Sequence, residues 1–242
     1  MVKKSSIPKL NKYARREELI DIPSFIVIAV EGDKAEPGYF RMIKREFRDG
    51  IKLEIIPSEQ NSSPEHLLNN LRRIKREYLD FGSKENPESF WMVCDVDLHK
   101  NFHTTIKEAQ KDGFKVAVSN PCFEVWLFSH LAEIRIEKSI TKFIKPNSEV
   151  LLEVDSNKKP NRDLSKKVKK ALDEIRPKKG SPKYKDVYLE RIDDAIRKTQ
   201  QNLKKVQSKD FLLEPKHIGQ TRVGELISEI RSKAKKSNRN SS

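Results

Sequence analysis

Three carboxylates stand directly after apolar segments that are typical of buried strands. Glu31 follows the apolar segment 25–30. Asp95 and Asp97 follow the apolar segment 90–94. In an extended chain, residues two apart point to the same side, so the two aspartate side chains should lie together. Clustered carboxylates repel one another unless a cation lies among them, and Mg²⁺ or Mn²⁺ prefers oxygen ligands. This pattern predicts a metal site suited to phosphodiester cleavage.

The competing interpretation is that these acids only form turns or cap helices. Asp after a strand is common in both roles, and Asp-x-Asp or Glu-Gly alone would be weak evidence for a metal. Because these acids stand at two strand ends within one alternating series of strands and helices, the metal site is favoured. Glu124 has the same two interpretations. It stands in the first turn of an expected helix, where the helix dipole favours an acid, and it could also be a further metal ligand.

Strand-like and helix-like segments alternate four times before residue 132, which is typical of a parallel α/β sheet. Right-handed crossovers bring the carboxyl ends of such strands to one edge, where ligands bind. Acids that are distant in the sequence should therefore converge there. The strand-like segments are 25–30, 53–56, 90–94 and 115–118.

The pattern from residue 132 onward is mainly helical and rich in lysine, with helices expected near 164–175, 186–206 and 219–233. This region has little apolar content and should pack on the sheet rather than form a core of its own. We therefore expect four parts: a basic N-terminal arm over 1–22, a catalytic core over 23–135, a helical Lys-rich extension over 136–233 and a disordered basic tail over 234–242.

The formal net charge of +14 is concentrated in a few segments. Residues 158–185 carry twelve Lys or Arg against three acids, and the segment after Ile230 carries five with no acid. Such segments suit a nucleic-acid partner, because cations that neutralise phosphates release counterions. A solvated surface that aids solubility is the alternative. The candidate phosphate contacts are Lys34 and Lys100, beside the carboxylates, and Lys166, Lys167, Lys170, Lys178 and Lys179 in the basic segment.

Several classes of protein do not fit this sequence. The apolar run 25–30 is far shorter than the roughly 20 residues of a membrane span, and no secretory signal is evident, so we expect a cytoplasmic protein without a membrane partner. Two cysteines make no disulfide framework, and no Cys/His group has zinc spacing. The chain lacks a Gly-Lys-Ser/Thr phosphate loop and should not bind ATP through one.

Several motifs resemble, in order, those of the RloB-like proteins, which are relatives of the Toprim domain of topoisomerases, primases and OLD-type nucleases. The most specific is the run Ser-Asn-Pro-Cys-Phe-Glu-x-Trp. One departure is Ala35, where the family pattern has Thr. The matching segments are 31–40, 95–97, 119–130 and Thr221-x-Val223-x-x-Leu226.

The resemblance implies a Toprim-like (Rossmannoid) four-stranded parallel sheet flanked by helices. It implies that Glu31 is the general acid/base and that Asp95 and Asp97 hold Mg²⁺. It also implies a nuclease acting on DNA or RNA, tRNA included, in bacterial anti-phage defence or abortive infection. The expected partners are nucleic acid and an AAA/ABC-type, RloA-like ATPase, and a homo-oligomer is left open.

Three functions remain open from the sequence. The first is a metal-dependent nuclease. The second is a non-catalytic nucleic-acid-binding or regulatory subunit of an ATPase complex, which would bind in a salt-sensitive way without metal-dependent turnover. The third is another phosphoryl-transfer enzyme, such as a small-molecule phosphatase or a nucleotidyltransferase, since Asp-x-Asp also follows a strand in such enzymes.

Overall fold

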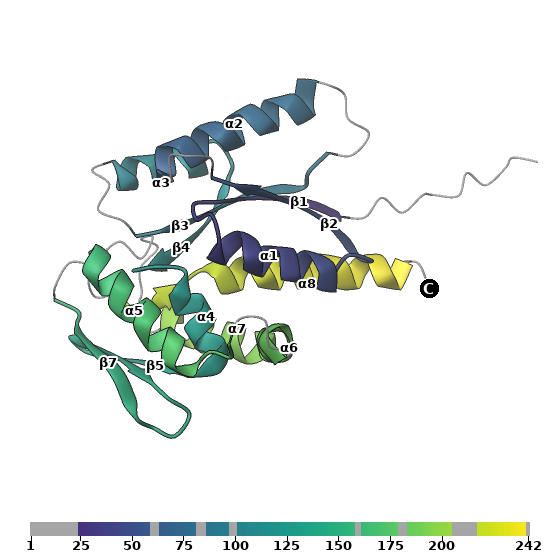
Figure 1. Ribbon diagram of the computed structural model, residues 1–242. Coiled ribbons are helices and arrows are strands. Elements are labelled where there is room, and N and C mark those ends of the chain that lie inside the picture. Colours follow the sequence, from purple (N-terminus) through teal and green to yellow (C-terminus); the bar gives the residue numbers. More distant parts are fainter. Residues whose placement is uncertain are drawn as a thin grey trace, which may run out of the picture.

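The computed structural model describes residues 24–58, 63–80, 86–96, 101–157, 161–178, 183–204 and 217–240. They form an α/β fold with a mostly parallel sheet between helices and a smaller antiparallel sheet to one side (Figure 1). Of the four expected parts, the N-terminal arm over 1–22 lies outside the described residues.

The central sheet has five strands in the order β2-β1-β3-β4-β8. The first four pair in parallel, and they confirm the four strand positions expected from the sequence. The fifth strand runs antiparallel to β4 and was not expected, because two residues are too short to show a periodic pattern. The bounds are β1 Ser24–Val30, β2 Ile51–Pro57, β3 Ser89–Asp95, β4 Lys115–Asn120 and β8 Gln220–Thr221.

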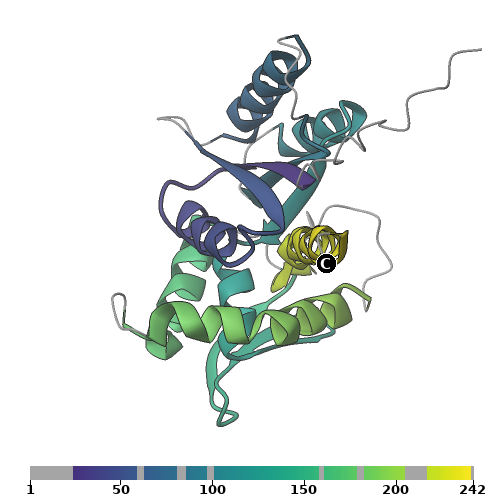
Figure 2. The same cartoon turned by 90° about the vertical axis from the view of Figure 1, so that its right-hand side faces the viewer.

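Helices cover both faces of this sheet (Figure 2). On one face, Phe25, Val27 and Ala29 of β1 belong to the core that α2 (Pro64–Asp80) and α3 (Phe102–Lys111) complete. The alternate residues of β1 belong to the core of the other face, with α1 (Ala35–Glu46), α4 (Glu124–Leu131) and α8 (Val223–Asn240). Burial on both faces explains why β1 is apolar throughout rather than alternating.

The strand order reverses at β1. The chain passes from β1 to β2 on one side, and β3 then pairs with β1 on its other side. In open α/β sheets the crevice at such a reversal, outside the carboxyl ends of the strands, is where ligands bind. Glu31 follows β1 and Asp95 ends β3, so the topology places both acids at this crevice.

A three-stranded antiparallel sheet follows α4, where the sequence pattern predicts a mainly helical segment. Its turns use Lys138 and Ser148 at positive φ (46° and 68°). Neither turn has the Asn-Gly, Asp-Gly or Gly-Gly pair that marks a tight hairpin, so the strongest hairpin signal is missing, and Pro146-Asn147 marks only a turn of no particular type. The strands are β5 Glu133–Glu137, β6 Ile140–Ile144 and β7 Val150–Asp155.

The C-terminal helices confirm the three expected helical regions. α5, α6 and α7 pack on α4, while α8 packs on α7 and on the central sheet. α8 continues through Asn240, past residue 234, where the sequence suggests a disordered tail. Packing explains the difference: Ala234 is buried, and a Cβ added to Gly50 would lie 2.6 Å from the Ala234 carbonyl oxygen. The remaining helices are α5 Arg162–Ile175, α6 Lys183–Glu190 and α7 Ile192–Lys204.

Within the described ranges, no helix combines the length and the apolar character that a membrane crossing requires.

Candidate active site

Glu31 and Asp95 lie side by side at the reversal of strand order. The backbone N–H of Glu31 donates to the Val93 carbonyl oxygen (3.1 Å), which continues the β1–β3 pairing past the end of β1. The backbone N–H of Asp95 donates to Glu31 Oε2 at 3.0 Å. Glu31 is only 8% exposed. The convergence of these two acids, which the sequence predicts from their strand ends, is therefore present.

A further carboxylate, Glu36, joins this pair. It stands in the first turn of α1, is 7% exposed and folds back over Gly32. A Cβ added to Gly32 would lie 2.5 Å from Glu36 Cδ. The glycine after Glu31 therefore makes room for the Glu36 carboxyl. Glu36 was not expected from the sequence, because an acid in a first helical turn is the ordinary partner of the helix dipole.

Glu124 comes from the third chain segment at this edge. β4 ends at Asn120, and Glu124 is the first residue of α4, with a side chain only 12% exposed. Its charge raises the pKa of both Asp95 and Glu36, so it lies within electrostatic reach of the other acids.

The carboxyls repel one another in a largely buried site. Burial, followed by the charges of Glu36, Glu31 and Glu124, raises the pKa of Asp95 well above its usual range. Burial and then the charge of Glu124 likewise raise the pKa of Glu36, against the backbone hydrogen bonds that lower it. A cation placed among these oxygens would relieve this repulsion.

The cation that the structure does place here is Lys169 of α5. Its Nζ lies 3.6 Å from Glu124 Oε1. Burial acts to lower the Lys169 pKa, but the charges of Glu124, then Cys122, Asp95 and Glu36 raise it overall. Helical periodicity could not single out Lys169. Lys167 and Lys169 flank the buried Val168 on opposite sides of α5, and only tertiary packing decides which flank meets the acids.

The donor set fits a hard divalent cation by type, since all four side chains offer carboxylate oxygens. Among the residues that the structure describes, however, no three His, Cys, Asp or Glu side chains form a group that could hold a metal ion. Asp97, the remaining predicted ligand, lies outside the described residues. Glu31, Glu36, Asp95 and Glu124 are hereafter called the carboxylate cluster.

The lysines predicted to contact phosphate are solvent-exposed wherever they are described. Lys34 is 84% exposed and lies 3.9 Å from Asp33 Oδ2. Lys167 pairs with Asp163 at 2.9 Å, and Lys166, Lys170 and Lys178 are also exposed. None of these contacts assigns them a role. Lys100 and Lys179 lie outside the described residues.

His130 is a buried core residue that joins α1 to α4. Its Nδ1 lies 3.0 Å from the Trp126 carbonyl oxygen, which can only accept, so Nδ1 carries the proton and donates. Nε2 is then the acceptor for the Tyr39 hydroxyl at 3.3 Å. The side chain is 0% exposed, and burial lowers its pKa to about 4. This contact helps to hold the two helices that carry Glu36 and Glu124.

In comparison with known proteins, the family model described as RloB-like protein matches residues 26–230. No curated protein and no solved structure matches the chain significantly.

Proposed function

The chain belongs to the RloB-like protein family, and from this premise we propose that it is a metal-dependent nuclease of the Toprim type. One observation carries the proposal. Carboxylates from three chain segments converge at the carboxyl ends of β1, β3 and β4, where the strand order reverses. Acidic residues at this position suit phosphodiester hydrolysis with Mg²⁺ or Mn²⁺.

Each residue of the cluster has a proposed task. Glu31 is the general acid/base, and its position is set by the N–H of Asp95. Asp95, Glu124 and Glu36, together with Asp97, would hold the cation. A bound Mg²⁺ would acidify a water molecule and stabilise charge on the phosphate. Lys169, beside Glu124, supplies a positive charge near the same place.

Metal-dependent cleavage tests this proposal. Plasmid, single-stranded DNA and total tRNA are incubated with the protein in Mg²⁺, Mn²⁺ or EDTA. We expect cleavage that EDTA abolishes, and at least about a 100-fold loss in Asp95→Asn. Glu46→Gln, which changes an exposed acid at the end of α1, is the matched control and should cleave normally. Equal cleavage by wild type and Asp95→Asn would refute the proposal.

The non-catalytic alternative also has support in the structure. Glu124 pairs with Lys169, and the described part of the chain holds no ready group of three metal donors. A binding or regulatory subunit needs only the basic surface. Salt-sensitive binding of nucleic acid by a wild-type protein that cleaves none of the three substrates in any metal would favour this alternative.

We further propose a role in bacterial anti-phage defence together with an RloA-like ATPase. The support is membership of the family and the resemblance of the motifs around Glu31 and Asn120. Co-expression with an RloA-like ATPase tests it. We expect lower phage plaque counts with the pair than with either protein alone, and no protection when the pair carries Asp95→Asn.

A further inference from the structure

A hollow lies at the end of α4 that is opposite the carboxylate cluster. Its volume is about 690 Å³, and its walls come from α7, β5 and the turn between β6 and β7. We call it the basic hollow, after the cations that line it. Its cationic lining residues are Arg135, Lys145, Arg191, Arg197, Lys198 and Lys204.

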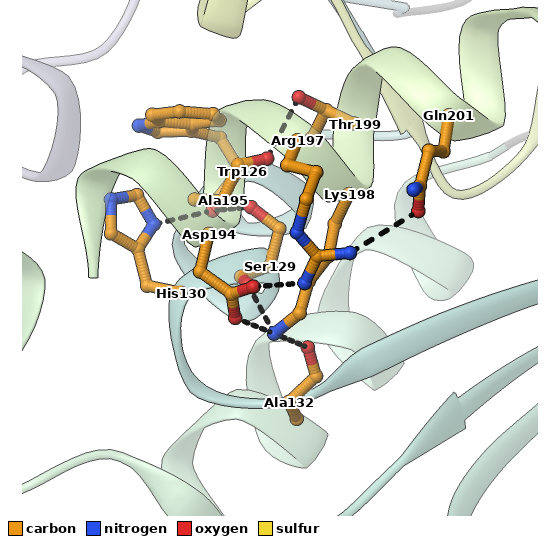
Figure 3. A network of polar contacts seen from close by, with 10 residues as sticks. All are labelled: Trp126, Ser129, His130, Ala132, Asp194, Ala195, Arg197, Lys198, Thr199 and Gln201. Atoms are coloured by element: carbon orange, nitrogen blue, oxygen red, sulfur yellow. Dashed lines mark hydrogen bonds and ion pairs between the residues drawn. The ribbon is translucent and has the colours of Figure 1, made fainter.

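Some of these cations hold the wall together (Figure 3). Lys198 donates to the carbonyl oxygens of Ser129 (3.2 Å) and Ala132 (3.1 Å), at the end of α4. It also lies 2.7 Å from Asp194, which pairs with Arg197 as well. Because a cation at a helix C-terminus is favourable, these contacts stabilise the junction of α4 and α7.

Two of the lining cations remain available to a ligand. Arg135 and Lys145 are not among them, because they pair with glutamates on their own hairpins. Arg191 and Lys204 are exposed, and within the described ranges neither side chain has a hydrogen bond or ion pair with another residue. Arg191 stands just before α7 and Lys204 is its last residue, so the helix rise separates them by about 20 Å. That span corresponds to about six phosphates along one strand of a duplex, and a single nucleotide could not bridge it.

The basic hollow continues toward α5. A second hollow of about 430 Å³ shares Leu131, Lys145, Pro146 and Arg191 with it and reaches Ile175, the last residue of α5. α4 and α5 run in the same direction, since Lys169 in the middle of α5 meets Glu124 at the start of α4, and Ile175 and Leu131 line one hollow at the ends of the two helices. The eight residues of α4 rise about 12 Å, so the hollows lie one short helix away from the carboxylate cluster.

The lining favours phosphates over bases. None of the described residues that line the two hollows is aromatic, so they offer no stacking platform. We propose that the basic hollow binds the sugar–phosphate backbone of a nucleic-acid strand a few nucleotides from the carboxylate cluster. This inference rests on the proposed function for its substrate class.

Binding without catalysis tests the inference. Labelled single strands of DNA and of RNA, about 20 nucleotides long, are titrated with the full chain in EDTA over a range of KCl concentrations. The variant Arg191→Gln/Lys204→Gln removes the two available cations. The control Lys107→Gln/Lys111→Gln removes two exposed lysines of α3, on the other face of the sheet.

We expect the first variant to bind at least about fivefold more weakly than wild type at moderate salt, and its slope of log K against log[KCl] to fall by about 1.4. The control should show neither change. Equal losses in the two variants, or no binding by wild type, would overturn the inference. Inorganic triphosphate that binds to wild type but not to Arg191→Gln/Lys204→Gln, together with unchanged strand affinity in this variant, would also overturn the inference. That result would favour a small polyphosphate as the ligand.

The two proposals fail separately. Weaker binding by Arg191→Gln/Lys204→Gln in a protein that never cleaves would keep the basic hollow and refute the nuclease. Metal-dependent cleavage with unchanged binding by this variant would keep the nuclease and refute the strand site.

Discussion

Glu31 combines a structural and a chemical task in one carboxyl group. Its Oε2 accepts the backbone N–H of Asp95, and its charge adds to the repulsion that raises the pKa of the Asp95 carboxyl. Substitutions can separate the two tasks, because an amide keeps the acceptor while losing the charge.

We therefore expect Glu31→Gln to remain as stable as wild type and Glu31→Ala to lose about 1–3 kcal/mol, because alanine leaves the Asp95 N–H without an acceptor. Both variants should lose cleavage. Urea unfolding of the three proteins measures the difference. Equal stability of the glutamine and alanine variants would show that the hydrogen bond contributes nothing.

Two glycines near the site should respond to alanine in opposite ways. In Gly32→Ala the new Cβ would collide with the Glu36 carboxyl, which must move, at a cost of about 1–3 kcal/mol. Gly38 lies within α1 with nothing within 4 Å of an added Cβ. Gly38→Ala should therefore stabilise the protein by up to about 1 kcal/mol. Thermal unfolding measures both, and a gain in Gly32→Ala would contradict the packing of Glu36 over this glycine.

At the scale of elements, the site depends on how α1 and α4 are held. The aromatic rings of Tyr39, Trp126, His130 and Tyr188 meet edge to face between these helices and α6. The charged groups that act on the His130 pKa are Lys198, then Asp194 and Arg191. Because His130 lies within this cluster, its protonation should affect how α1, α4 and α6 pack together.

Burial lowers the His130 pKa to about 4 in the folded chain, from the ordinary histidine value of 6.5. Between these pH values the unfolded chain binds more protons, so stability is complete above about pH 6.5 and falls as the pH drops toward 4, by up to about 3 kcal/mol. His130→Gln should show a shallower loss. Urea unfolding at several pH values compares the two proteins. Parallel pH profiles would contradict a neutral, buried His130.

At the scale of the whole molecule, the fold brings acidic side chains and basic side chains into different regions. The carboxylate cluster gathers negative charge at one end of α4, while the basic hollow gathers cations at the other end. A substrate strand that runs along α5 would meet cations before it reaches the acids.

Divalent metal should stabilise the folded chain as a whole, because the carboxylate cluster exists only in the folded state. At a Mg²⁺ concentration ten times the Kd, the gain is about 1.4 kcal/mol. Thermal unfolding with MgCl₂, against KCl of equal ionic strength, measures it. Asp95→Asn should reduce the shift in melting temperature. An equal shift in this variant would place the metal elsewhere.

The order of strands and helices up to residue 131 could be predicted from the sequence, as could the meeting of Glu31 with Asp95. Local patterns suffice for this, because continuous apolar runs identify doubly covered strands and parallel strands share one carboxyl edge. The family motifs are local in the same sense, and the match over residues 26–230 confirms the resemblance.

Tertiary structure alone decided that Glu36 folds over Gly32 and that Lys169, rather than Lys167, reaches the acids. It also decided the small sheet, whose turns lack glycine, and the basic hollow, whose walls come from α7 and two hairpin segments. The place of Lys169 and the basic hollow depend on contacts between segments far apart in the chain, and such contacts leave no periodic signal within either segment. The fold of Glu36 over Gly32 and the small sheet are local, but an acid in a first helical turn has an ordinary role at the helix dipole, and hairpins without glycine lack their strongest sequence signal.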